Sequence, residues 1–425
     1  MQKSWKDTFV IGFALFSMFF GAGNVIFPPY LGLGCGREWL LGFLCYYLAD
    51  IGLALVALFA ILKGGGSESI TQPLGRVPSA VLMSAIVLCI GPMLAIPRTA
   101  ATTYEMSVLP LAAGFSPALF SALFFLVILL LCLQESAVVD IVGRFLTPAL
   151  LIGLLILIVK GVVSPIGSVP DRVLVDNVVR TGIEAGYQTM DVLAAMVFGI
   201  IVLNSAREKG HTETKAQYRV VAGAGIIAGT VLLVVYLGLT YLGVTMSEFF
   251  NLSVLRTYLM VAIVRNLLGH GGIFLFSIVV ALACVTTAVA LVSSSAAFFS
   301  ELSKGKLPYK ALVAVICVFS AVVSNIGLEQ IVSIAAPVLE LVYPPTLVLI
   351  VLAFFRRWLP EDLPLQLAAA GALLYSGLSF LRSCGVPMEI LDQLPLSSFG
   401  FGWMAPAIIG LLLGVALCRT RQRSA

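Results

Sequence analysis

Twelve stretches of mostly apolar residues, each long enough to cross a lipid bilayer, run along this sequence of 425 residues. A transmembrane helix needs about 20 such residues. The stretches lie near residues 8–33, 39–62, 79–109, 115–133, 140–163, 181–205, 217–244, 269–299, 309–327, 331–355, 364–382 and 399–418. Because lipid cannot hydrogen-bond an exposed backbone, segments of this length cross it as helices. The sequence therefore predicts an all-α polytopic membrane protein with about 12 transmembrane helices.

The composition agrees with a membrane protein and excludes several other classes. Hydrophobic residues make up 60% of the chain and charged residues 11%, where a soluble domain carries roughly 25% charged residues. The net charge of +4 gives no support to nucleic-acid binding. His211 and His270 lie in or beside loops, which excludes a histidine-based metal or proton site within the membrane. The eight cysteines show no metal-binding spacing.

The distribution of lysine and arginine predicts how the chain is oriented. The first apolar run follows Lys3 and Lys6, as in a signal peptide, but it is too long and lacks a convincing cleavage site, so we interpret it as the first span. With the N-terminus inside, 17 of the 25 lysines and arginines fall in cytoplasmic connections. Cytoplasmic loops carry an excess of these residues. An even number of spans then predicts that both termini are cytoplasmic.

Two spans contain residues that interrupt a helix. The first includes LFSMFFGAGNVIFPPYLG, with two glycines, an asparagine and a Pro-Pro pair, and the sixth, TGIEAGYQTMDVLAAMVFGIIVLN, carries glycines and Asp191. Glycine and proline are common in ordinary membrane helices too, but broken helices in corresponding halves are typical of inverted-repeat transporters. We expect residues 1–425 to form a single membrane transport domain. Its five-helix inverted repeats would lie at approximately 8–163 and 181–355, with two further helices at approximately 364–418.

A break in a membrane helix exposes groups of both polarities. The half-helix that follows Gly23 would begin with unpaired N–H groups and a positive dipole end, which suit a carboxylate. The half-helix before the break would end in unpaired carbonyl groups, which suit an ammonium group or a small hard cation. One interruption can therefore hold both poles of a zwitterion, the form that an amino acid takes at neutral pH.

The eighth span offers a second group of oxygen atoms. In LACVTTAVALVSSSAAFF, Thr286 and Thr287 follow Ala283 by three and four residues, so two hydroxyls and one carbonyl share a helix face. Hard oxygens clustered in this way suit Na⁺. In membrane helices a threonine hydroxyl also bonds the carbonyl one turn back, so the spacing alone leaves a structural role equally open.

The charged residues that we place inside the bilayer are Asp50, Arg98, Glu105, Asp191 and Glu340. Such residues are costly in lipid and face a cavity or a partner. Asp191, beside the break in the sixth span, is a candidate to bind a substrate ammonium or a cation, with a structural ion pair as the alternative. For Arg98 and Glu105 an ion pair between spans and a gate over the substrate stay open. The sequence gives Glu340 no role.

Five segments resemble the branched-chain amino acid:cation symporter family, whose members include the BrnQ-like carriers. They are FFGAGNVIFPPYLG, GPMLAIPRTAATTYE, GYQTMDVLAAMVFGI, CVTTAVALVSSSAAFF and VLELVYPPTL, and together they extend over nearly the whole chain. The resemblance implies a leucine-transporter-like fold of five plus five helices with broken helices 1 and 6. It also implies import of leucine, isoleucine and valine with Na⁺ across a bacterial inner membrane.

The resemblance also implies site residues. For Na⁺ it implies the carbonyls of Ser17, Phe20 and Ala283 with the hydroxyls of Thr286 and Thr287. Because one residue fewer separates Asn24 from the Phe-Pro pair than in the broader fold, Phe16 and Phe19 are alternatives for the first two. For the substrate it implies Gly21, Ala22, Gly23 and Asn24 on the carboxylate side and Thr189, Asp191, Ala194 and Phe198 around the amine and aliphatic side chain. Arg98 and Glu105 stay as gate or ion-pair candidates.

We therefore expect a carrier that is not an enzyme, that works by alternating access and that uses Na⁺ as its coupling ion. One alternative is an H⁺-coupled amino acid carrier in which Asp191 or Glu105 titrates. Another is an intramembrane aspartyl enzyme that uses Asp50 and Asp191, but no HExxH or GxSxG motif accompanies that pair. The expected partners are a small amino acid and membrane lipid. The sequence leaves the oligomeric state, the coupling ratio and the preference among the three amino acids open.

Overall fold

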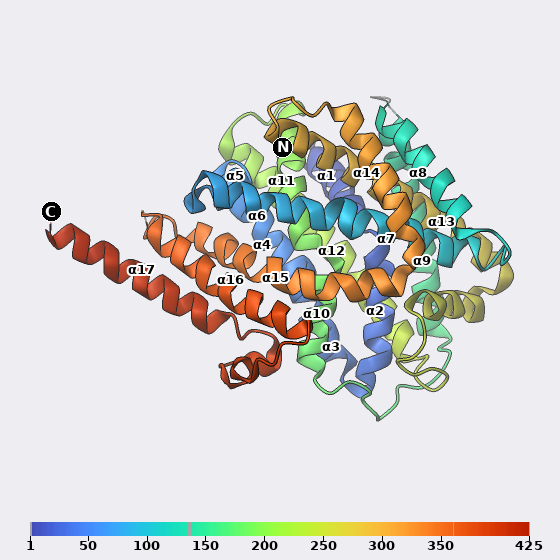
Figure 1. Ribbon diagram of the computed structural model, residues 1–425. Helices are drawn as coiled ribbons and strands as arrows, with labels where there is room; N and C mark the ends of the chain where they lie inside the picture. The colour runs from blue at the N-terminus through green and yellow to red at the C-terminus, as the bar shows by residue number, and fades with distance from the viewer. Residues whose placement is uncertain (1, 134–137, 360, 425) are drawn as a thin grey trace.

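The computed structural model describes residues 2–133, 138–359 and 361–424, and nearly all of these residues are helical (Figure 1). No strand occurs within these ranges, so the predicted all-α class is confirmed. The helices are α1 Gln2–Phe19, α2 Ala22–Cys35, α3 Trp39–Tyr47, α4 Leu53–Gly64, α5 Glu68–Thr71, α6 Arg76–Leu88, α7 Ala95–Thr103, α8 Pro117–Leu133, α9 Val138–Val163, α10 Val178–Thr189, α11 Asp191–Glu208, α12 Thr214–Val244, α13 Arg256–Leu302, α14 Tyr309–Val323, α15 Leu328–Phe354, α16 Leu363–Ser383 and α17 Met404–Ser424.

Eight helical segments of the described residues are long and apolar enough to cross a membrane. They are Ala22–Gly64, Arg76–Val108, Val178–Glu208, Thr214–Val244, Arg256–Leu302, Tyr309–Ile326, Leu328–Phe354 and Leu363–Ser383, and shorter apolar helices lie at Pro117–Leu133, Leu150–Val163 and Met404–Thr420. Each of the twelve predicted ranges overlaps a helix. On α9, Ile152, Ile156 and Val159 recur on one face and are all exposed. Such an apolar stripe suits lipid and not water. The number of crossings and the inverted repeat stay predictions.

The first break lies between α1 and α2, at Phe20 and Gly21, so the second half-helix begins at Ala22 and not after Gly23 as expected. It is not caused by the prolines, because Pro28 and Pro29 lie inside α2, and the expectation that they interrupt the span is wrong. A proline ring holds φ near a helical value and removes only one backbone donor, which neighbouring groups can compensate for in a membrane helix. Two glycine contacts between α2 and α12 are close: a Cβ on Gly32 would lie 2.0 Å from the Thr240 carbonyl oxygen, and one on Gly243 would lie 1.9 Å from that of Pro29.

The second predicted break separates α10 from α11 at a single residue. Met190 has a φ of 68° and a ψ of 15°, in the left-handed region that a non-glycine residue rarely adopts. The glycines of this span do not form the break. A Cβ on Gly182 would lie 2.5 Å from the Gly42 carbonyl oxygen, and one on Gly186 would lie 2.8 Å from that of Tyr46. These glycines let α10 approach α3 closely.

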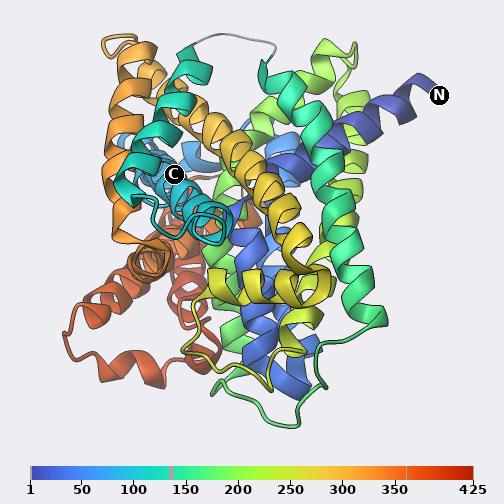
Figure 2. The same cartoon turned by 90° about the vertical axis from the view of Figure 1, so that its right-hand side faces the viewer.

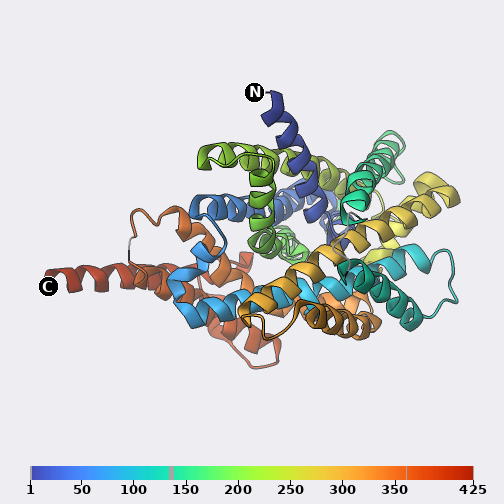
Figure 3. The ribbon, with the colours of Figure 1, turned by 90° about the horizontal axis from the view of Figure 1, so that it is seen from above.

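The two breaks lie in the interior of the molecule. Helix α12 packs on α1, α2 and α11, and α13, which bends at Gly269, packs on α1 and α2 (Figure 2), while α10 packs on α2 and α3. Helices α16 and α17 pack on each other, and α16 packs on α15, at one side of this bundle (Figure 3). The arrangement places the interrupted helices at the centre and the last two helices at the periphery.

Candidate functional site

The two breaks meet at a small central cavity of about 30 Å³. Seven of the eight predicted substrate residues line it. They are Gly21, Ala22, Asn24, Thr189, Asp191, Ala194 and Phe198. The eighth, Gly23, lies against Arg98, because a Cβ on Gly23 would be 2.8 Å from Arg98 Nη2. A water molecule needs roughly 10–15 Å³ measured in this way. The cavity therefore accommodates a water or two, and an amino acid enters only if the surrounding helices separate.

A chain of polar side chains connects the two breaks. Asn24 Nδ2 donates to Asp191 Oδ2 at 2.8 Å and also contacts the Tyr236 hydroxyl. On the other side of the second break, Thr189 Oγ1 donates to Asp50 Oδ1 at 2.7 Å. Asp50 is 0% exposed. Because an unpaired buried polar group is costly, these contacts tie both breaks to α12 and to the turn at Leu48–Gly52.

Tyr236 was not singled out by the sequence reasoning. It lies in α12 within the apolar run LLVVYLGL and is completely buried. A tyrosine in the middle of an apolar span is the signal that could have marked it, because its hydroxyl needs a polar partner in lipid. The sequence does not show that Asn24 is that partner, since the two residues are 212 positions apart.

Arg98 fills the carbonyl end of α10. Its Nη1 donates to the Gln188 carbonyl at 2.6 Å and its Nη2 donates to the Thr189 carbonyl at 3.2 Å. The last carbonyls of a helix have no partner within the helix and carry a negative partial charge. The guanidinium donates hydrogen bonds to these carbonyls and offsets their negative partial charge, so it stabilises the end of α10 at the second break. These hydrogen bonds go to main-chain oxygens and not to Asp50 or Asp191.

Glu105, the other gate or ion-pair candidate, lies outside the central cavity. Its Oε2 accepts a hydrogen bond from Thr257 Oγ1 at 2.7 Å, and its Oε1 accepts one from the Leu328 N–H at 3.0 Å. Leu328 is the first residue of α15. A carboxylate at this position accepts a hydrogen bond from an otherwise unpaired N–H and interacts favourably with the positive end of the helix dipole. Glu105 therefore connects the turn at Tyr104–Val108 to the starts of α13 and α15.

The predicted cation residues lie where α13 passes the first break. Thr287 lines the central cavity, and its hydroxyl is buried without a hydrogen-bond partner among the described residues. A Cβ on Gly21 would lie 3.7 Å from that hydroxyl oxygen. Thr286 Oγ1 donates to the Ala283 carbonyl at 2.8 Å, the local bond that the sequence left as the alternative. Ala283 and Phe20 line a neighbouring cavity of about 10 Å³.

These oxygens fit a small hard cation in their chemistry. Hydroxyl and carbonyl oxygens are the donors that hard cations prefer, and a buried hydroxyl without a partner has a lone pair to offer. Ser17 lies in the last turn of α1. The carbonyl of Phe16, one of the alternatives, accepts the N–H of Phe20 at 2.8 Å, while Phe19 is the last residue of α1 and lines the central cavity.

A second, larger cavity of about 520 Å³ lies between α2, α10, α15 and the start of α13. Arg256 forms an ion pair with Glu329 there, and its guanidinium lies 4.3 Å from the ring centre of Tyr30. Phe27 separates this outer cavity from the central one. Its ring centre lies 5.9 Å from the Arg256 guanidinium and 5.7 Å from that of Arg98. The sequence does not show this contact between Arg256 and the aromatic rings.

Solved structures with a similar fold include a symporter. The model matches a Na⁺-coupled sialic acid symporter in a substrate-bound outward-open state, with a TM-score of 0.64 and 11% identity over 96% of this chain and 90% of that chain. It also matches MhsT in complex with L-phenylalanine, with a TM-score of 0.59 and 16% identity over 95% of this chain and 98% of that one. These likenesses confirm the leucine-transporter-like fold.

Relatives in sequence agree with one another in their descriptions. The Escherichia coli K12 branched-chain amino acid permease BrnQ is 34% identical over 99% of this chain and 98% of its own length. The Pseudomonas aeruginosa branched-chain amino acid transport system 2 carrier protein is 36% identical over 97% of this chain and 96% of its own. These proteins are named as permeases and carriers and not as enzymes. The model of the branched-chain amino acid transport protein family matches residues 4–421, and this chain belongs to that family of multi-pass membrane transporters.

Proposed function

We propose that this protein is a Na⁺-coupled symporter that imports leucine, isoleucine and valine across a bacterial inner membrane by alternating access. The observation that carries the proposal is the meeting of two broken helices at a cavity beside the unpartnered hydroxyl of Thr287. Broken helices at the centre of a membrane bundle present dipole ends to a substrate and its ion. The names of the relatives supply the class of substrate.

The groups around the central cavity suit the parts of an amino acid. The N-terminal end of α2, which begins at Ala22, offers main-chain N–H groups to a carboxylate. Asp191 offers a carboxylate to an ammonium group. Ala194 and Phe198 form an apolar wall beside them, which suits an aliphatic side chain. A branched-chain amino acid would thus be oriented by its charged end and selected by its apolar end.

The ion would be held by Thr287, Thr286 and the carbonyls of Ala283, Ser17 and Phe20. Na⁺ would supply a positive charge that stabilises the carbonyl end of α1 next to the substrate site. Because ion and substrate would share the first break, each should tighten the binding of the other, and the coupling must be reciprocal. In the proposed orientation the outer cavity faces the outside, and Phe27 closes it from the central cavity until helices move.

The proposal is tested by leucine uptake into proteoliposomes. We expect an inward Na⁺ gradient to drive uptake and a proton gradient alone to drive none. Thr287→Ala should weaken the Na⁺ dependence, so that uptake needs a higher Na⁺ concentration. Thr230→Ala is the matched control, because Thr230 Oγ1 donates to the Ile226 carbonyl at 2.8 Å on an exposed face of α12 and does not line the central cavity. Equal Na⁺ dependence in the wild type and Thr287→Ala would contradict the assigned cation site.

An H⁺-coupled carrier is the second candidate, and one observation favours it. Asp50 and Asp191 belong to the hydrogen-bonded chain that joins the breaks, and Asp50 Oδ2 has no hydrogen-bond partner among the described residues. A buried carboxylate can carry a proton through a transport cycle. In the same experiment, this candidate predicts uptake under a proton gradient without Na⁺ and loss of that uptake in Asp191→Asn.

A further inference from the structure

A third cavity, of about 430 Å³, lies at the side of the molecule where α10 and α15 meet α16 and the segment 384–403. Its volume falls within the range of roughly 300–1,000 Å³ that is typical of small-molecule sites. The cavity is lined by Arg180, Glu184, Glu340, Tyr375, Arg382 and Trp403, among others. Glu184 also lines the outer cavity. The third cavity is thus a neighbour of the outer cavity but is built largely by α16 and the segment 384–403.

The charges of this cavity leave one carboxylate without a cationic partner. Arg180 Nε donates to Glu184 Oε1 at 2.6 Å, and Arg382 Nη1 donates to Asp392 Oδ1 at 2.7 Å. Glu340 Oε2 accepts a hydrogen bond from Ser379 Oγ at 3.3 Å. No ion pair joins Glu340 to any residue that the structure describes. Two arginines against three carboxylates leave one negative charge in excess, and that charge belongs to Glu340.

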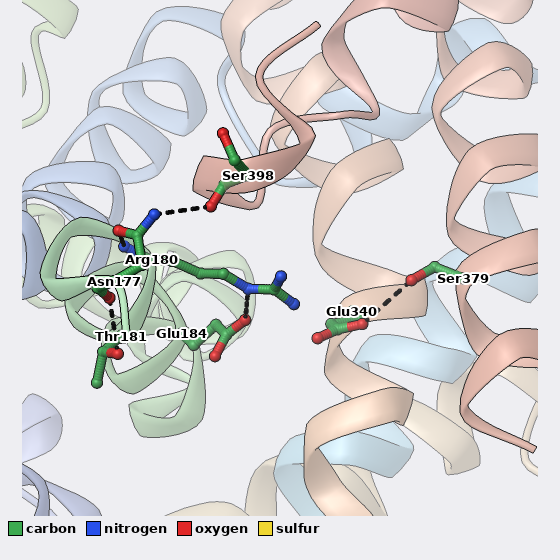
Figure 4. Close-up of polar contacts among 7 residues, drawn as sticks. All are labelled: Asn177, Arg180, Thr181, Glu184, Glu340, Ser379 and Ser398. Carbon is green, nitrogen blue, oxygen red and sulfur yellow. Dashed lines mark hydrogen bonds and ion pairs between the residues drawn. The ribbon is translucent and has the colours of Figure 1, made fainter. Parts of the chain in front are cut away.

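Arg180 and Glu340 face each other across the cavity (Figure 4). The guanidinium bonds Glu184 through Nε, and its two outer nitrogens point toward Glu340 without a contact within 4 Å. Asn177 connects α10 to the segment after α16. Its Oδ1 accepts the main-chain N–H of Arg180 at 3.0 Å, and its Nδ2 donates to the Ser398 carbonyl at 3.0 Å. The segment that follows α16 is thereby attached to the start of α10.

Opposite charges that face each other without contact match a ligand that carries both charges. An ammonium group would pair with Glu340, which has no cation of its own, and a carboxylate would bond the two outer nitrogens of Arg180 in the bidentate geometry that guanidinium groups favour. Apolar surface lies next to them, from Ile183, Pro344 and Leu391. A charged end and an apolar side chain would both be accommodated.

We propose that this cavity is a second binding site for a zwitterionic amino acid with an apolar side chain, distinct from the central site. The choice of ligand rests on the proposed function, but binding in this cavity does not require transport. The proposal gives Glu340 a role, as the ammonium partner. It also gives α16 and the segment 384–403, which lie outside the predicted repeats, a part in recognition.

Trp403 provides a direct measurement, because it lines the cavity and is one of only four tryptophans in the chain. We would titrate the purified full-length protein with L-leucine and follow tryptophan fluorescence. The wild type should show a saturable change, and Trp403→Phe should not. Glu340→Gln should raise the half-saturating leucine concentration about tenfold or more, the loss that follows when a charge-assisted bond is removed.

Three controls separate this site from the central one. Glu389 is an exposed carboxylate in the segment 384–403 and does not line the cavity, so Glu389→Gln should behave as the wild type. Asp191→Asn, in the central cavity, should keep the Trp403 response. Isoamylamine lacks the carboxylate of leucine, and 4-methylpentanoate lacks its amine. Each should bind at least tenfold more weakly than leucine. Equal binding of isoamylamine and leucine would overturn the assignment of a zwitterion.

The two proposals fail in different ways. If Na⁺-driven leucine uptake is normal but Trp403 does not respond, or responds equally in Glu340→Gln, the second site is wrong and the proposed function stands. A response that disappears in Asp191→Asn would also overturn the second site, because the signal would then originate at the central cavity. If Trp403 responds as described but no Na⁺ gradient drives uptake, the second site stands and the proposed function is wrong.

Discussion

The two helix breaks differ in what occupies their carbonyl ends. At the second break the last carbonyls of α10 are satisfied by the chain itself, because Arg98 donates to those of Gln188 and Thr189. At the first break the Phe16 carbonyl accepts the Phe20 N–H, and the nearby Thr287 hydroxyl has no hydrogen-bond partner among the described residues. One break carries a built-in cation, and the other lies beside the Thr287 hydroxyl. We infer that the second break is a fixed element and that the first is the one that needs a ligand.

The largest expected effect comes from removing the built-in cation. Arg98→Met should leave two buried carbonyls without a donor, which costs about 2–5 kcal/mol. We expect a lower melting temperature of the purified protein and a loss of leucine uptake of roughly 100-fold or more, since the second break would lose its geometry. Arg98→Lys, which keeps the charge but not the two-pronged donor, should recover only part of both quantities.

The outcome of this pair of variants decides the comparison. If Arg98→Met keeps both normal stability and normal uptake, the guanidinium does not fix the second break, and the proposed division between the breaks is wrong. Normal stability with lost uptake would instead place Arg98 in direct contact with the substrate.

A smaller effect should follow from the charge that joins the two breaks. Asp191→Asn keeps the size of the side chain and an oxygen that can accept from Asn24, so we expect the melting temperature to change little. Leucine uptake should fall by about tenfold to 100-fold, because a neutral amide binds an ammonium group less strongly than a carboxylate does. Uptake rates over a range of leucine concentrations measure this loss, and an unchanged half-saturating concentration would show that Asp191 does not bind the amine.

The first break can be examined through the two neighbouring threonines. Thr287→Ala should raise the half-saturating Na⁺ concentration for uptake about tenfold, since it removes the unpartnered hydroxyl. Thr286→Ala should have a smaller effect, because that hydroxyl already donates to the Ala283 carbonyl and contributes only its lone pair to an ion. Equal effects of the two substitutions would show that the bond from Thr286 opens when Na⁺ binds.

The sequence predicted the positions of both breaks better than their causes. Hydropathy located the spans because lipid imposes length and apolarity on each segment separately. The causes depend on contacts between distant segments, and these were not predictable. Pro28 and Pro29 are accommodated within α2, while Met190, an ordinary apolar residue in the sequence, has the left-handed conformation. No local pattern shows that Arg98 bonds carbonyls 90 residues away.

The smallest expected effect is that of Gly21→Ala, and it tests why the first break exists. Gly21 has a φ of −110° and a ψ of −170°, an extended conformation that any residue adopts. An added Cβ would lie 3.4 Å from Thr287 Cγ2, an ordinary contact. We therefore expect leucine uptake to fall less than about threefold, because the break depends on what surrounds the backbone and not on the flexibility of glycine. Gly23→Ala is the contrasting variant, since its Cβ would meet Arg98 at 2.8 Å and disturb the second break as well. If Gly21→Ala abolishes uptake while Gly23→Ala does not, the first break requires glycine itself, and the division between a fixed break and a ligand-dependent break fails.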